Sequence, residues 1–175
     1  MQWFKVPSKT YFERDSIQYL QKCRDVERVM IVTDHAMVEL GFLDRIIEQL
    51  DLRRNKVVYQ IFADVEPDPD ITTVMKGTEL MRTFKPDTII ALGGGSPMDA
   101  AKVMWLFYEQ PEVDFHDLVQ KFMDFVNVPS SSLSLVRKQN LWLFQQPQVQ
   151  DQRLQPFAVS QIRPTTASTQ LLTIH

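Results

Sequence analysis

The chain has 175 residues, 44% of them hydrophobic and 23% charged, with a net charge of −3 and a single cysteine, Cys23. That length is typical of one domain, and a lone cysteine excludes an internal disulfide framework, which favours a reducing, cytoplasmic location. The chain has no apolar run of the roughly 18 residues that a membrane span needs, no apolar signal core at its start and no excess of basic charge, so neither a membrane nor a nucleic acid is an expected partner.

The first half of the chain alternates strand and helix patterns. Residues 28–33 form a short apolar, β-branched run, typical of a strand that is buried on both faces of a parallel sheet. The next apolar residues follow helical spacing and predict one amphipathic helix from residue 36 to residue 50. Residues 56–62 predict a second strand. The predicted helix face consists of Ala36, Leu40, Leu43, Ile47 and Leu50.

Two prolines, Pro67 and Pro69, predict a loop over residues 64–70 because each disfavours helical backbone before it. Asp70 can cap the helix that follows. One face of that helix is predicted to carry Ile71, Val74, Met75, Met81 and Phe84.

Residues 87–92 predict a third strand, followed by a helix over residues 96–110 and another over residues 115–123. Strands and helices that alternate with short connections predict βαβ units with right-handed crossovers. The expected fold class is therefore α/β, a Rossmann-like parallel sheet flanked by helices.

Three consecutive glycines, Gly93 to Gly95, separate the third strand from its helix, although the chain has only five glycines in all. Glycines permit a tight turn and close backbone approach, so free N–H groups at the helix start can bind a phosphate or pyrophosphate. Ser96 is predicted to cap this helix, with Pro97 at its first position and Asp99 completing a variant of the capping box. The alternative is a tight turn that binds nothing. The pattern matches neither the G-x-G-x-x-G fingerprint nor the ATP-binding loop, so it does not identify a nucleotide.

Two aspartates are further candidates for binding. Asp34 follows the first strand, where a carboxylate can accept hydrogen bonds from a ribose diol and repel a 2′-phosphate, which favours NAD over NADP. Its structural alternative is a helix cap, and the two roles are compatible. Asp68 could contact a ligand at the same sheet edge, although a turn aspartate is the default interpretation. The three histidines are too scattered to suggest a metal site, and no catalytic residues can be assigned.

The composition changes abruptly after Asp124. Residues 1–124 hold 15 basic and 21 acidic side chains, whereas residues 125–175 hold four basic residues and one acidic residue, nine glutamines and no glycine. Residues 141–144 could form a strand, but residues 145–155 show no periodicity and little apolar content. The sequence therefore predicts a poorly structured C-terminal tail.

Three segments together resemble the iron-containing alcohol dehydrogenases, most closely the alcohol dehydrogenase half of the bifunctional aldehyde–alcohol dehydrogenases. They are residues 31–34, residues 65–69 and residues 84–102, and the stretches at 3–7 and 104–105 fit as well. The resemblance implies an N-terminal nucleotide-binding domain over residues 1–124. It also implies NAD as the cofactor, bound by Gly94, Gly95, Ser96, Pro97, Met98 and Asp99 at the pyrophosphate and nicotinamide end, with Asp34 at the adenosine ribose and Asp68 in the same cleft.

In that family an iron ion polarises the oxygen of a small alcohol or aldehyde while NAD exchanges the hydride, and a homo-oligomer is compatible with the resemblance. The family continues after Asp124 with Ile-Pro-Thr-Thr-Ser-Gly-Thr-Gly-Ser-Glu and, much later, with an aspartate and three histidines that bind the metal. This chain contains neither, so the metal ligands are expected to be absent. The expectation is a truncated enzyme that retains the NAD-binding half. The alternative is a non-catalytic nucleotide-binding or subunit-interaction module.

A change of reading frame near codon 125 would account for the composition of the tail. Residues 143–152 can be encoded as CTA TTC CAA CAA CCT CAG GTA CAG GAT CAG, and reading from the third nucleotide yields Ile-Pro-Thr-Thr-Ser-Gly-Thr-Gly-Ser. The same phase gives family-like stretches from residues 125–132 and 162–175. The hypothesis is that one nucleotide is missing near codon 125, so that residues 125–175 form an out-of-frame tail. The alternative is a genuine short protein with a novel tail.

Overall fold

The computed structural model describes residues 9–13, 15–111, 140–145 and 157–162. Within these ranges the elements are one 3-10 helix, η1 (Ser16–Lys22), four α-helices and six strands in one sheet. The α-helices are α1 (His35–Glu39), α2 (Phe42–Asp51), α3 (Ile71–Phe84) and α4 (Gly95–Glu109). The strands are β1 (Lys9–Glu13), β2 (Arg28–Val32), β3 (Val58–Phe62), β4 (Thr88–Gly93), β5 (Asn140–Gln145) and β6 (Phe157–Ile162).

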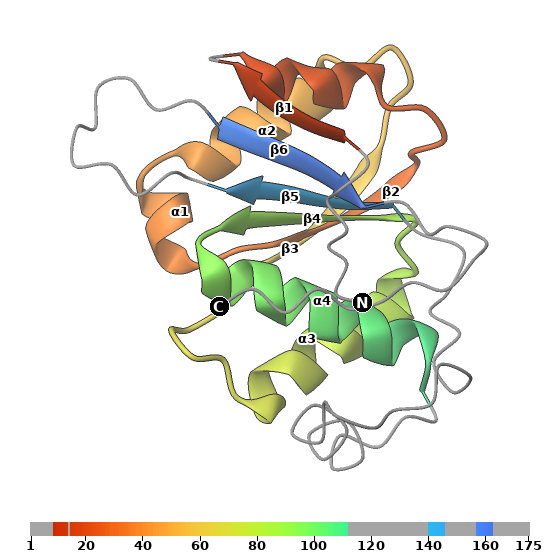
Figure 1. The fold of residues 1–175 in the computed structure, drawn as a ribbon. Helices are drawn as coiled ribbons and strands as arrows, with labels where there is room; N and C mark the ends of the chain where they lie inside the picture. Colours follow the sequence, from red (N-terminus) through yellow and green to blue (C-terminus); the bar gives the residue numbers. More distant parts are fainter. Residues whose placement is uncertain (1–8, 14, 112–139, 146–156, 163–175) are drawn as a thin grey trace, which may run out of the picture.

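The sheet has the order β1-β6-β5-β4-β2-β3 (Figure 1). Strands β3, β2, β4 and β5 run parallel, whereas β6 is antiparallel to both β5 and β1. The three strands predicted in the first half of the chain are thus confirmed, and they lie next to one another. The α/β class and the parallel arrangement are confirmed as well.

Two apolar layers cover the sheet because successive residues of a strand face opposite sides. Met30 and Ile89 belong to the layer that includes buried residues of α3 and α4. Val29 and Ile31 belong to the other layer, with buried residues of η1 and α2. Every residue of β4 is buried, and Figure 1 shows α3 and α4 together on one side of the sheet. These layers fix β2 and β4 in place, and both strands lead into candidate site residues.

The single helix predicted over residues 36–50 is wrong, because the structure breaks it into α1 and α2. Gly41 lies at the break with a φ of +74°, a left-handed conformation that ends one helix and starts the next. Leu40 is therefore 58% exposed rather than on the apolar face. The buried face of α2 consists of Leu43, Ile46, Gln49 and Leu50.

Helix α3 confirms the loop and the cap predicted before it, since Asp70 is the N-cap and its Oδ1 accepts a hydrogen bond from the N–H of Thr73 at 2.7 Å. Val74 and Met81 are buried as predicted. Met75 is 41% exposed, so its assignment to the apolar face is wrong. Gly77 and Thr78 are buried instead, and Gly77 faces α4, because a Cβ on it would meet the side chain of Met104.

Within residues 125–175 the structure describes two strands, β5 and β6, where the sequence predicted one strand and an otherwise poorly structured tail. β5 includes the predicted apolar run 141–144 and pairs in parallel with β4, from Thr88 opposite Asn140 to Gly93 opposite Gln145. An apolar run of this kind suits a position beside a fully buried strand. The helix predicted over residues 115–123 lies outside the described residues.

Candidate functional site

The glycine turn joins the end of β4 to the start of α4. Gly93 is the last residue of the strand and has a φ of +140°, which an L-residue rarely adopts. Gly94 caps α4 in an extended conformation, and Gly95 begins the helix. A Cβ on either Gly94 or Gly95 would have no heavy atom within 4 Å, and both residues are exposed. The turn thus presents open space in front of the first N–H groups of a 15-residue helix.

Helix α4 starts before Ser96, so the prediction that Ser96 caps it is wrong. Ser96 and Pro97 are the second and third residues of the helix rather than its cap and first residue. Pro97 is tolerated there because the first four N–H groups of a helix have no partner within the helix. Asp99 does not complete a capping box, since its Oδ1 accepts a hydrogen bond from Nζ of Lys102 at 2.9 Å. A glycine cap leaves the helix amides free of any cap side chain, which suits an anion better than a serine cap would.

Pro97 and Met98 support the turn from the protein side. A Cβ on Gly93 would lie 2.8 Å from Cγ of Pro97, which is buried directly behind the strand end. Met98 is half-buried and packs against the core layer between the sheet and α3 and α4. Both side chains hold the start of α4 against the sheet.

Asp34 lies beside this turn because β2 and β4 are parallel neighbours that end at the same edge. Its Oδ1 accepts a hydrogen bond from the N–H of Met37 at 2.9 Å and caps α1, which confirms the structural role considered for it. Its Oδ2 would lie 3.0 Å from a Cβ on Gly93. One carboxylate therefore caps a helix with one oxygen and places the other beside the glycine turn.

Asp68 lies in the loop that follows β3, the strand on the other side of β2. It is exposed and has a φ of +53°, in keeping with the tolerance of aspartate for left-handed turn positions. The turn interpretation is thus confirmed for its backbone. The structure places Oδ2 of Asp34 beside Gly93, whereas Asp68 shares only the sheet edge with them.

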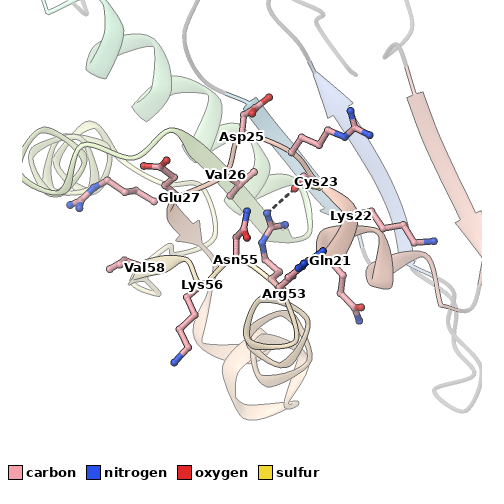
Figure 2. Close-up of a pocket in the computed structure, with 13 residues that line it drawn as sticks. Gln21, Lys22, Cys23, Asp25, Val26, Glu27, Arg53, Asn55, Lys56 and Val58 are labelled. Atoms are coloured by element: carbon pink, nitrogen blue, oxygen red, sulfur yellow. Dashed lines mark hydrogen bonds between the residues drawn. The ribbon is translucent and has the colours of Figure 1, made fainter.

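A separate hollow of about 840 Å³ lies at the opposite edge of the sheet, where β2 and β3 begin (Figure 2). Its floor includes Arg53, which is buried and donates through Nη2 to the carbonyl oxygen of Cys23 at 2.7 Å. Its exposed basic side chains do not converge, since Lys22 and Lys56 point in different directions in Figure 2. This hollow has the character of a solvated surface between two loops, and Arg53 serves to anchor the end of η1.

Among the described residues, no group of three or more histidine, cysteine, aspartate or glutamate side chains is arranged to hold a metal ion. His35, for example, faces only Asp64, with 3.7 Å between Nε2 and Oδ1, and both side chains are largely exposed. No helix in the described ranges is long and apolar enough to span a membrane.

Sequence reasoning assigned no role to Thr33, which directly follows β2 at the sheet edge that holds Asp34 and the glycine turn. Thr33 is fully buried, and its Oγ1 donates a hydrogen bond to the carbonyl oxygen of Leu92 at 2.9 Å. The signal was a single hydroxyl at the end of an otherwise apolar strand. Most buried hydroxyls have a hydrogen-bond partner, because burial without one costs free energy.

The parallel strands, the flanking helices and the glycine turn at the carboxyl edge define a Rossmann-like α/β domain. The family model for the iron-containing alcohol dehydrogenases matches residues 7–137, so the chain belongs to this family. The resemblance drawn from the sequence motifs is thereby confirmed.

Individual relatives agree with this assignment. The chain is 94% identical over 124 residues to an aldehyde-alcohol dehydrogenase of Streptococcus pneumoniae serotype 4, and the match covers 71% of this chain and 14% of that protein. It is 38% identical over 140 residues to an NADPH-dependent butanol dehydrogenase of Clostridium saccharobutylicum, covering 75% and 36% of the two chains. The chain thus spans about one seventh of the length of the first relative and about a third of the second.

A solved structure of an iron-containing alcohol dehydrogenase from Thermococcus thioreducens superimposes with a TM-score of 0.53 at 28% identity. The superposition covers 57% of this chain and 26% of that one. Sequence and structure therefore point to the same family, and both match only part of the relatives.

Proposed function

We propose that this chain is the NAD-binding part of an iron-containing alcohol dehydrogenase and that it does not oxidise alcohols by itself. The observation that carries the proposal is the open glycine turn beside Oδ2 of Asp34. Residues Gly94 and Gly95 leave room for a ligand, and the free N–H groups and positive dipole end of α4 attract its negative charge.

The pyrophosphate of NAD would bind at Gly94, Gly95 and Ser96, and the adenosine ribose would bind Oδ2 of Asp34. A ribose diol donates to a carboxylate oxygen, whereas a 2′-phosphate is repelled by it, so NAD should bind better than NADP. Met98 and Asp99 would border the nicotinamide end, and Asp68 would line the same edge, as the family resemblance implies. Pro97 acts indirectly, because it packs behind Gly93 and holds the turn in shape.

In the family reaction a primary alcohol loses a hydride to NAD and a proton to solvent, giving an aldehyde. Iron would supply Lewis-acid polarisation of the alcohol oxygen. The described residues offer no ligand set for that ion, so this chain is proposed to contribute cofactor binding alone. Small alcohols or aldehydes, a cytoplasmic location and association with further copies belong to the proposal for the intact enzyme.

We also propose that residues 125–175 are translated out of frame. The 94% identity to the Streptococcus pneumoniae relative extends over 124 residues, which is the length of the segment before the compositional change. Resequencing the gene around codon 125 tests this directly. Bases that restore the family-like sequence in the other phase would support the proposal, and codons incompatible with that phase would refute it.

The functional proposal is tested by calorimetric titration of the purified chain with NAD, followed by addition of ethanol and ferrous iron while NADH absorbance is recorded. The expected result is saturable NAD binding without NADH formation. Absence of binding would refute the NAD site, and measurable turnover would refute the restriction to cofactor binding.

A further inference from the structure

Thr33 directly precedes Asp34, and its buried side chain connects two neighbouring strand ends. Its Oγ1 donates to the carbonyl oxygen of Leu92 at 2.9 Å, and Leu92 directly precedes the glycine turn. The sheet pairing between β2 and β4 ends one residue earlier, at Val32 opposite Ala91. The hydroxyl thus links the two strands just beyond their last paired residues.

The backbone of Thr33 makes the corresponding connection to the strand on its other side. Its N–H donates to the carbonyl oxygen of Phe62 at 2.9 Å, and its carbonyl oxygen accepts from the N–H of Val65 at 3.4 Å. One residue therefore ties together the ends of β2, β3 and β4. These ends lead into Asp34, the loop of Asp68 and the glycine turn.

We infer that Thr33 is a positioning residue for dinucleotide binding, an inference that rests on the proposed function. A dinucleotide must contact Asp34 with its ribose and the turn with its pyrophosphate at the same time, so the separation of these two points affects its affinity. Thr33 is fully buried and stands behind the site, where it holds that separation through the bond to Leu92. Its two backbone bonds do not involve the side chain, so substitution by valine or serine tests the hydroxyl alone.

The test compares Thr33→Val, which removes the donor at nearly constant volume, with Thr33→Ser, which keeps it. Thr78→Val is the matched control, because Thr78 is also fully buried and its Oγ1 donates to the carbonyl oxygen of Val74 at 2.8 Å within α3, outside the sheet edge. Each protein is titrated calorimetrically with NAD and with NADP. The ratio of the two affinities is the decisive readout, since a general loss of stability would lower both together.

Thr33→Val is expected to weaken NAD binding by up to about fivefold, because the free energy of the lost bond between Thr33 and Leu92 limits how far the site can shift from its binding geometry, and to lower the preference for NAD over NADP. Thr33→Ser should restore the NAD affinity and the preference for NAD over NADP, and Thr78→Val should change neither quantity. Wild-type affinities in Thr33→Val, no recovery in Thr33→Ser, or an equal effect of Thr78→Val would each overturn the inference. A wild-type chain that does not bind NAD would instead refute the proposed function, and the inference with it.

Discussion

Replacement of Gly94 by valine is expected to weaken NAD binding without changing the stability of the fold. Gly94 has a φ of −82°, so it does not need the positive φ that favours glycine, and a Cβ there would meet no heavy atom within 4 Å. The free energy of unfolding should therefore change by less than about 0.5 kcal/mol, as for other surface substitutions that break no contact. The same side chain would occupy the space in which we propose that the pyrophosphate lies.

The expected loss of NAD affinity follows from the bonds that the phosphates would make. Each hydrogen bond between a charged oxygen and a backbone N–H contributes about 1.5–3 kcal/mol. Displacement of one such bond corresponds to a loss of affinity of roughly tenfold or more. Calorimetric titration measures this loss, and thermal unfolding of the same samples measures stability.

Gly41→Ala is the matched control for folding. Gly41 has a φ of +74° with no heavy atom near a Cβ, so alanine there costs about 1 kcal/mol of backbone strain, and Gly41 is not among the residues proposed to contact NAD. This variant should melt about 2–4 °C lower and bind NAD as the wild type does. The reasoning is refuted if Gly94→Val binds NAD with wild-type affinity, or if Gly41→Ala loses as much affinity as Gly94→Val.

Three further outcomes are expected. Asp34→Asn keeps an oxygen that can cap α1 but removes the negative charge, so calorimetric titration should show a smaller preference for NAD over NADP. An unchanged preference would exclude Asp34 from the ribose site. Gly77→Ala places a Cβ against Sδ of fully buried Met104. Urea denaturation should therefore show that the free energy of unfolding falls by about 1–3 kcal/mol, with little change in NAD affinity. Wild-type stability would show that Met104 can move aside. The N–H of Thr73 lowers the pKa of Asp70 below its ordinary 3.8, so the cap stabilises the fold above that pH and is lost as the pH falls through the lowered pKa. Asp70→Asn should remove this pH dependence of the free energy of unfolding, and the same dependence of stability on pH in both proteins would contradict it.

The sequence was sufficient for three strands of the first half, β2, β3 and β4, and for the position of the glycine turn, but it did not predict β1. Buried parallel strands are continuous apolar runs, and β2 and β4 have no competing interpretation. Asp34 and Asp70 were predictable as caps because an aspartate before a helical pattern satisfies free N–H groups. These features depend on neighbours along the chain, which a sequence displays.

Other features depend on contacts that a sequence does not display. Apolar spacing continued across Gly41, so it could not show that the helix breaks there. Ser96 is a good cap by residue type, but the structure starts α4 at Gly95. Met75 is exposed whereas Gly77 is buried, because α3 and α4 approach closely where Gly77 meets Met104. The bond from Thr33 to Leu92 joins residues 59 positions apart and could be recognised only in the folded chain.

The most direct test of the NAD site is a crystal structure of this chain with NAD. The account predicts that the pyrophosphate lies against the N–H groups at the start of α4, near Gly94 and Gly95, with the adenosine ribose within hydrogen-bond distance of Oδ2 of Asp34. NAD bound in the basic hollow around Arg53, or a glycine turn left empty at saturating NAD, would contradict it.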